Sequence, residues 1–169
     1  TTVVNAYVGP RVTSYLESLV TRVKEAGYRN QLLVMQASGG VMSRPYIEGS
    51  PIRVLASGPA GGFIGSAHVG VAKGYPNLLC VDMGVTSYDI SMVLNGAAPA
   101  VAGWNMHHRY LVGVPMVQVE TLGAGGGSIC HVNNGEIAVG PASAGAQHGP
   151  ICYGRGGTQP TVTDALLML

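Results

Sequence analysis

Residues 78–94 read LLCVDMGVTSYDISMVL, two apolar runs on either side of a short, more polar turn. This pattern predicts a β-hairpin with strands over residues 78–81 and 89–94 and a turn over residues 83–87. The polar groups of the hairpin are concentrated at its tip. The tip is therefore the first candidate for a functional site.

The tip carries groups that suit a nucleotide phosphate and its metal ion. Asp82 leaves a buried strand, so its carboxylate is a candidate catalytic group and a candidate ligand for Mg²⁺ or its bound water. Gly84, Thr86 and Ser87 offer backbone N–H and hydroxyl donors for phosphate oxygens. Asp89 is a candidate for orienting a catalytic water. Alternatively, Asp82 and Thr86 only satisfy the backbone of the turn, and the spacing alone favours neither interpretation.

A glycine-rich loop, GAGGGS, occupies residues 123–128 after a predicted strand over residues 114–121. Its candidate nucleotide-binding residues are Gly123, Gly125, Gly126, Gly127 and Ser128. Successive glycines let a flat or anionic ligand lie against the main chain. The loop is not the dinucleotide motif GxGxxG, because a predicted hairpin rather than a helix follows it. A strained turn is the alternative, but two glycine-rich turns in one small domain favour a shared ligand.

The remaining elements alternate between helices and strands, which predicts an α/β fold. Apolar positions with helical spacing predict an amphipathic helix that begins at Gly9-Pro10 and ends at Gly27. Strands are expected over residues 31–36 and 52–55, and a helix over residues 57–73 with Gly74 as its stop. A second hairpin is expected over residues 129–139. Thr163 is expected to cap a final helix.

Composition excludes several classes of partner. Hydrophobic residues make up 47% and charged residues 10% of the 169 residues, which predicts one compact folded domain. The formal net charge is +1 and no basic run is present, so neither nucleic acid nor a membrane surface is expected as a partner. No apolar stretch reaches the length of a membrane span, and no signal peptide is recognised, so a cytoplasmic protein is expected.

Histidine and cysteine offer weaker candidates. His107, His108 and Arg109 either bind a substrate or metal ion or belong to a solvated loop. Cys130 and His131 are neighbours on a predicted strand and point to opposite faces, which argues against a thiolate and base pair. Cys152, in a Gly/Pro-rich loop, is the cysteine most suited to a test of reactivity.

Six blocks of sequence, in order, resemble the central domain of hydantoinase A and 5-oxoprolinase proteins, members of the hydantoinase/oxoprolinase family. The blocks are LLVMQASGGV, SGPAGG, DMGVTSYDIS, VETLGAGGGSI, VGPASAGA and GPICYGRGGTQPTVTDA, and they cover nearly the whole chain. The resemblance implies an actin-like (ribonuclease H-like) ATPase domain with a mixed sheet and flanking helices. The hairpin over residues 82–89 would be its second phosphate hairpin, and the loop over residues 123–128 its adenosine-side loop.

The resemblance also implies an activity. Family members use ATP and Mg²⁺ to phosphorylate the carbonyl oxygen of a cyclic amide, such as hydantoin, 5-oxoproline or another lactam, before water attacks. Relatives phosphorylate a ketone such as acetone or acetophenone for carboxylation, and a non-catalytic binding or assembly module is a further alternative. Residues 1–169 are expected to form a single nucleotide-binding domain, one half of a cleft in a longer chain. Its expected partners are the remaining domains or a hydantoinase B-type subunit, in an oligomer.

Three positions depart from the family pattern. Val85 stands where the family hairpin has a second glycine, and a β-branched residue resists positive φ, which predicts weaker phosphate binding. Glu120-Thr121 replaces His-Thr before the glycine loop. Residues 146–150 read AQHGP instead of Ala-Asp-Pro-Gly-Pro, so roles at these positions are not carried over.

Overall fold

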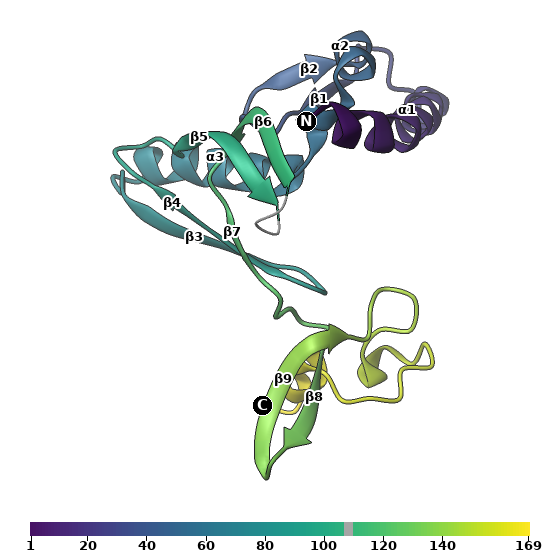
Figure 1. The fold of residues 1–169 in the computed structure, drawn as a ribbon, viewed down its shortest axis with the longest axis vertical. Helices are drawn as coiled ribbons and strands as arrows, with labels where there is room; N and C mark the ends of the chain where they lie inside the picture. The colour runs from purple at the N-terminus through teal and green to yellow at the C-terminus, as the bar shows by residue number, and fades with distance from the viewer. Residues whose placement is uncertain (107–109) are drawn as a thin grey trace. The chain divides into compact units, whose positions relative to one another are not determined.

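The structure is a computed structural model that describes residues 1–106 and 110–169 (Figure 1). The chain forms two compact units, and each is made of two separate segments. The first unit comprises residues 1–78 and 92–118, and the second comprises residues 79–91 and 119–169.

The first unit begins with a helix, α1 (Thr2–Glu25), that is longer than the sequence pattern predicts. The expected start at Gly9-Pro10 is wrong, because Pro10 lies inside the helix. Tertiary contacts stabilise the extra turns: the Asn5 side chain accepts a hydrogen bond from the N–H of Ile52 at 3.0 Å, and Val4 packs against the core. These contacts outweigh the weak helix propensity of the β-branched residues there.

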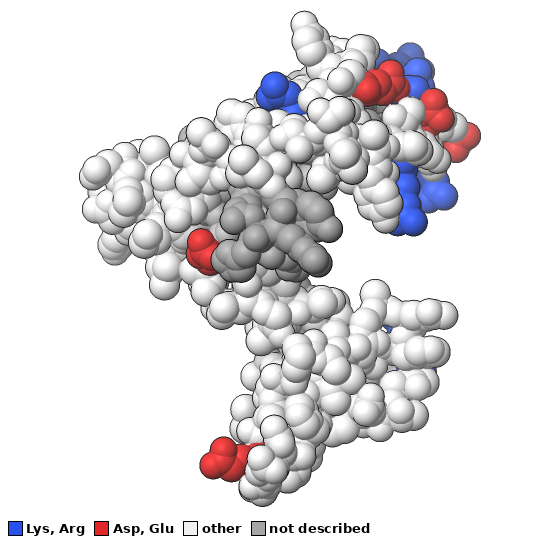
Figure 2. All heavy atoms as spheres, viewed as in Figure 1, with Lys and Arg blue, Asp and Glu red and all other residues white. Residues whose placement is uncertain are grey.

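A hairpin of β1 (Leu33–Met35) and β2 (Val41–Ser43) leads into α2 (Arg44–Gly49) and a 3₁₀ helix, η1 (Pro51–Val54). The expected strand over residues 52–55 is therefore wrong. Pro51 presets a helical φ, and the N–H of Leu55 bonds to the carbonyl of Ile52 at 3.2 Å. A short apolar run cannot distinguish a buried strand from a buried helical turn. In the view of Figure 2, most of the visible charged side chains of this unit lie over α1 and α2.

The first unit is completed by α3 (Ser57–Ala72) and by an antiparallel hairpin of β5 (Ala100–Met106) and β6 (Tyr110–Val117). The predicted helix over residues 57–73 is confirmed, and Gly74 follows it with a φ of +82°. The core cluster joins residues of β6 to a residue in the β1–β2 loop and one in η1: Ala37, Ile52, Val112, Val114 and Met116.

The second unit contains most of a three-stranded sheet in the order β3-β4-β7 (Figure 1). The strands are β3 (Leu78–Met83), β4 (Tyr88–Val93) and β7 (Glu120–Leu122), so the predicted phosphate hairpin is confirmed as a hairpin. β7 pairs antiparallel with β4 in a register that places Asp89 opposite Thr121. The strand expected over residues 114–121 is divided between β6 and β7.

The rest of the second unit is a hairpin followed by two short helices. β8 (Ser128–Asn133) pairs with β9 (Glu136–Ser143), as predicted, and η2 (Ile151–Tyr153) and α4 (Val162–Leu167) follow. The expected cap at Thr163 is wrong by two residues: Thr161 caps α4 and forms a capping box with Asp164. The sequence Thr161-Val-Thr-Asp offers two candidate hydroxyls, but only Thr161 has the acidic residue three positions later that this box needs.

Helices and strands occur in both units, so the α/β fold class is confirmed. Four strand pairs are antiparallel: β1–β2, β4–β7, β5–β6 and β8–β9. They belong to small sheets of two or three strands. None of the helices formed by residues 1–106 and 110–169 is long and apolar enough to cross a membrane.

Candidate functional site

The turn between β3 and β4 leaves a set of hydrogen-bond donors without protein partners. The N–H of Gly84 donates to the carbonyl of Ser87 at 2.9 Å and closes the turn. In contrast, no hydrogen bond among the described residues uses the N–H groups of Val85, Thr86 and Ser87 or the hydroxyls of Thr86 and Ser87. Thr86 is exposed and Ser87 half-buried. Consecutive free N–H groups at a turn form a concavity that suits an anion.

The glycine loop lies directly against this turn, so the structure brings the two predicted glycine-rich segments together. The N–H of Gly126 donates to the carbonyl of Gly84 at 2.9 Å, and the N–H of Gly127 donates to the carbonyl of Val85 at 2.7 Å. The N–H of Gly125 donates to Ser128 Oγ at 2.8 Å. These amides are therefore occupied within the protein, and the loop supports the turn.

Close approach explains the glycines of the loop. A Cβ atom on Gly125 would lie 2.6 Å from the carbonyl oxygen of Val85, which is closer than real Cβ contacts. A Cβ on Gly127 would lie 2.7 Å from Val85 Cγ1. Neither glycine has a positive φ. Ser128 is fully buried, and its hydroxyl accepts the bond from Gly125 instead of facing a ligand.

Val85 does not strain the turn. Its φ is not positive, so the predicted conflict between a β-branched residue and a left-handed backbone is wrong. The side chain is 37% exposed and its Cγ1 lies beside Gly127. The position accepts valine because the turn here does not need the conformation that favours glycine.

The two candidate carboxylates have different surroundings. Asp82 is exposed on β3 and makes no side-chain hydrogen bond or ion pair with the residues that the structure describes. Asp89, half-buried on β4, accepts a 2.6 Å hydrogen bond from Thr121 Oγ1 on β7, which fixes its orientation. Within the described part of the chain, no group of three His, Cys, Asp or Glu residues could hold a metal ion. Asp82 therefore suits Mg²⁺ only when phosphate oxygens and water complete the coordination, as is usual for this ion.

A pocket of about 310 Å³ adjoins the turn and the glycine loop. It is lined by Met83, Gly84, Val85, Gly126, Gly127, Pro150, Tyr153, Thr163 and Leu166. Thr163 joins α4 to the loop, because its Oγ1 and its N–H both donate to the carbonyl of Gly126, at 2.8 and 2.9 Å. The volume is at the lower end of the range for small-molecule sites. Sequence reasoning missed Tyr153 and Thr163, although both lie in the last of the six blocks.

Asp164 fastens η2 to the start of α4. Its carboxylate accepts hydrogen bonds from the N–H groups of Ile151 and Cys152 at 3.2 and 2.7 Å, and from the N–H and hydroxyl of Thr161, both at 2.8 Å. Desolvation opposes ionisation, but the bonds from Cys152 and Thr161 outweigh it and hold the pKa of Asp164 well below its usual range. Desolvation, together with the Asp164 carboxylate, raises the pKa of the Cys152 thiol, which argues against a reactive thiolate.

The other candidates stand apart from this site. Cys130 and His131 are consecutive residues of β8, which places their side chains on opposite faces of the strand, as expected. His107, His108 and Arg109 lie outside the described residues.

The free N–H and hydroxyl donors of the turn, which the glycine loop holds in place, suit an anion such as a phosphate group. The chain belongs to the hydantoinase/oxoprolinase family, whose family model matches residues 1–169. This assignment confirms the resemblance of the six sequence blocks.

Similar proteins include ATP-dependent enzymes. The chain is 43% identical to the caprolactamase subunit alpha of Pseudomonas jessenii over 170 residues, which are 100% of this chain and 24% of that subunit. The solved structure of ATP-dependent caprolactamase from that organism matches with a TM-score of 0.71 and 41% identity, over 100% of this chain and 24% of that chain. A nucleotide-free structure of acetone carboxylase matches with a TM-score of 0.77 and 30% identity, over 91% of this chain and 22% of that chain.

A third relative is 5-oxoprolinase 1 of Arabidopsis thaliana, which is 34% identical over 171 residues, or 100% of this chain and 13% of that protein. The chain thus spans about a quarter or less of the length of the relatives described here.

Proposed function

We propose that this chain is the phosphate-binding part of a cytoplasmic, ATP-dependent enzyme that hydrolyses a cyclic amide. The substrate class is a lactam such as caprolactam or 5-oxoproline, or a hydantoin. The observation that carries the proposal is the set of free donors at Val85, Thr86 and Ser87. The similarity to a caprolactamase and a 5-oxoprolinase supports the lactam class.

In the proposed reaction, the terminal phosphoryl group of ATP moves to the carbonyl oxygen of the amide, and ADP leaves. Water then attacks the activated carbon, the C–N bond of the ring opens, and inorganic phosphate is released. The free N–H and hydroxyl groups of the turn bind phosphate oxygens, whose charge grows as the bond to ADP breaks. Mg²⁺, when bound, would neutralise part of that charge, with Asp82 as its protein ligand or as an acceptor for its water.

The remaining site residues have supporting or orienting roles in this proposal. Asp89 is held by Thr121 and orients water, while Gly84 closes the turn. Gly125, Gly126 and Gly127, with Ser128, hold the turn in place through the bonds described above. Gly123, exposed at the start of the loop, stays a candidate for contact with the nucleoside.

The test is amide-dependent release of phosphate from Mg-ATP by the intact enzyme. Replacing Asp82 with alanine is expected to lower turnover by about a hundredfold or more, because the metal loses its protein ligand. Glu136→Ala removes an exposed carboxylate from the first residue of β9 and serves as the control, with turnover unchanged. Caprolactam, hydantoin and 5-oxoproline are compared as substrates. Unchanged turnover in the Asp82 variant would refute the assigned role.

A ketone carboxylase is the second candidate function, and the TM-score of 0.77 with acetone carboxylase favours it. The same enzyme is assayed with acetone or acetophenone, bicarbonate and Mg-ATP. Ketone-dependent rather than lactam-dependent ATP hydrolysis would select this candidate.

A non-catalytic assembly module is the third candidate function. Calorimetric titration with Mg-ATP tests it, because such a module should bind nucleotide weakly or not at all. Because relatives are named as subunits, we also propose that the protein works in an oligomer with further domains or a hydantoinase B-type subunit.

A further inference from the structure

The first unit contains a second pocket, of about 780 Å³. The residues that line it are distant in sequence from the proposed phosphate-binding residues. The β1–β2 hairpin, α2 and η1 supply its walls: Leu33, Gln36, Val41, Met42, Ser43, Pro45, Tyr46, Gly49, Ser50 and Arg53. All of these residues belong to the first unit. The volume lies within the range of small-molecule sites.

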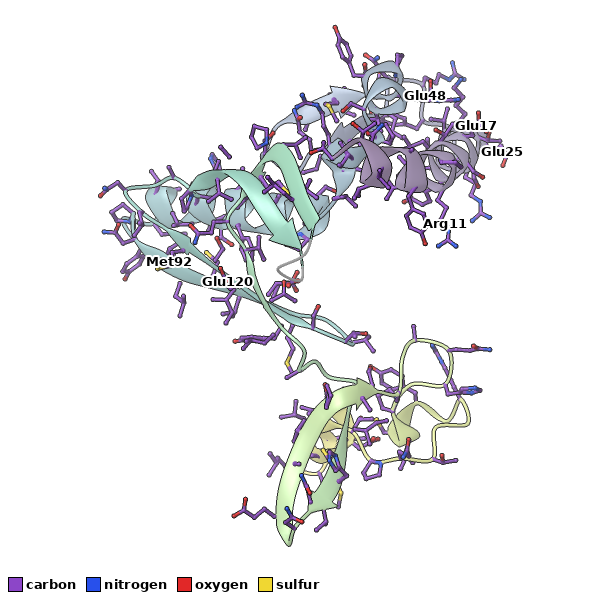
Figure 3. All side chains as sticks on the ribbon, in the orientation of Figure 1. Arg11, Glu17, Glu25, Glu48, Met92 and Glu120 are labelled. Carbon is purple, nitrogen blue, oxygen red and sulfur yellow. The ribbon has the colours of Figure 1, made fainter. Side chains whose placement is uncertain are left out.

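Arg53 is the charged residue among those that line the pocket. It is half-buried, and its guanidinium forms no ion pair or hydrogen bond with the residues that the structure describes. The nearby Arg44 differs, because it pairs with Glu17 at 3.1 Å and with Glu48 at 2.5 Å; both carboxylates are labelled in Figure 3. A partly desolvated guanidinium without an acidic partner favours the binding of an anion.

Two hydroxyls of the same pocket also make no hydrogen bond with the residues that the structure describes. Ser43 and Ser50 occupy the cap positions of α2 and η1, yet neither side chain makes a capping hydrogen bond. Both residues line the same pocket as Arg53, so their hydroxyls are available there as donors. Leu33, Val41 and Met42 add apolar wall on the side of the hairpin. The pocket thus combines a cationic, donor-rich part with an apolar part.

We propose that this pocket binds a small organic carboxylate. The carboxylate group is held by Arg53 in a charge-assisted, bidentate hydrogen bond, with Ser43 and Ser50 as further donors, while the carbon skeleton packs on the apolar wall. One guanidinium matches the single charge of a carboxylate. Phosphate carries more charge at neutral pH and has no carbon skeleton for Leu33, Val41 and Met42 to contact.

The test compares two ligands that share a ring and differ in the carboxylate: 5-oxoproline and 2-pyrrolidone. Both are titrated into the nucleotide-free protein while the backbone amide signals are followed by NMR, so the result is independent of the proposed ATP chemistry. The expected result is a shift of signals around Ser43, Ser50 and Arg53, with 2-pyrrolidone binding at least about ten-fold more weakly. Equal affinity for the two ligands, or shifts confined to other residues, would overturn the proposal.

Variants test the role of Arg53 directly. Arg53→Gln is expected to remove the preference for 5-oxoproline, and its amide spectrum shows whether the variant is folded. Arg11→Gln loses the same charge from an exposed position on α1 and is expected to keep the preference (Figure 3). A preference that survives in Arg53→Gln would contradict the proposal. So would inorganic phosphate that shifts the same signals with equal or higher affinity, because the ligand class would then be wrong.

Discussion

Asp164 stabilises the second unit through its ionised form. Its four hydrogen bonds tie η2 to α4 and lower its pKa. A carboxyl whose pKa is lower in the folded state contributes stability above its unfolded pKa of about 4, and this stability is lost as pH falls toward the folded value. Asp164→Asn is therefore expected to lower the melting temperature at neutral pH. The difference from the unsubstituted protein should narrow below about pH 4, as followed by circular dichroism.

The alkylation rate of the Cys152 thiol is a second measurement of the effect of the Asp164 carboxylate. Because Asp164 contributes to the raised pKa of the Cys152 thiol, Asp164→Asn should speed its alkylation by iodoacetamide near pH 8, measured by mass spectrometry. Cys130 in the same sample is the internal reference. Glu136→Gln controls for the loss of a carboxylate. A difference in melting temperature that persists unchanged at low pH would show that the Asp164 carboxylate is not the cause.

At the scale of elements, the contact between the glycine loop and the β3–β4 turn can be tested with two alanine substitutions. Gly125→Ala places a methyl group against the carbonyls of Val85 and Gly84, so we expect a loss of about 1–3 kcal/mol in the free energy of unfolding. Gly123→Ala is the matched control, because its Cβ would meet nothing within 4 Å and its φ is not positive. Chemical denaturation measures both. Equal effects would mean that the loop does not support the turn.

The elements that sequence reasoning predicts well have local signals. α3 has a Ser-Gly-Pro start and a glycine stop, and the β8–β9 hairpin has Asn134-Gly135 at its turn, where Asn134 adopts a φ of +51°. The missed features depend on tertiary contacts. The first turns of α1 rest on Asn5 and its bond to η1, and periodicity does not report such a contact.

In the candidate site too, local features are predictable from the sequence and tertiary contacts are not. The turn and the glycine loop were predicted as segments and expected to share a ligand, and the structure does place them together. Sequence could not show that the amides of Gly125, Gly126 and Gly127 face the protein, because glycine suits both close packing and ligand contact. It also could not show that Thr121 would hold Asp89, since that contact depends on the pairing of β4 with β7.

For the whole molecule, exposed apolar surface predicts self-association. Val132 and Ile137 lie opposite each other on β8 and β9 and are 73% and 83% exposed, and Leu166 and Leu167 of α4 are also exposed. Ile137→Lys should reduce concentration-dependent growth of the mass measured by light scattering, because a charge disfavours apolar contact. Val3→Lys, which adds the same charge at an exposed site on α1, is the control. A mass that does not depend on concentration would contradict this prediction.

The discontinuous second unit has a consequence for the order in which the chain acquires structure during synthesis. Ile90 on β4 pairs with Glu120 on β7. Closing the loop of residues between them costs about 3 kcal/mol of chain entropy, if only the term that depends on loop length is counted. The β1–β2 hairpin and the turns of α3 are held by hydrogen bonds between residues nearer in sequence and can form while translation continues at about 5–20 residues per second. The β3–β4 turn emerges in mid-chain, but its supporting glycines arrive some 40 residues later. A nascent chain that ends before Gly126 therefore carries every proposed phosphate donor of the turn and none of the hydrogen bonds from the loop that hold the turn in place.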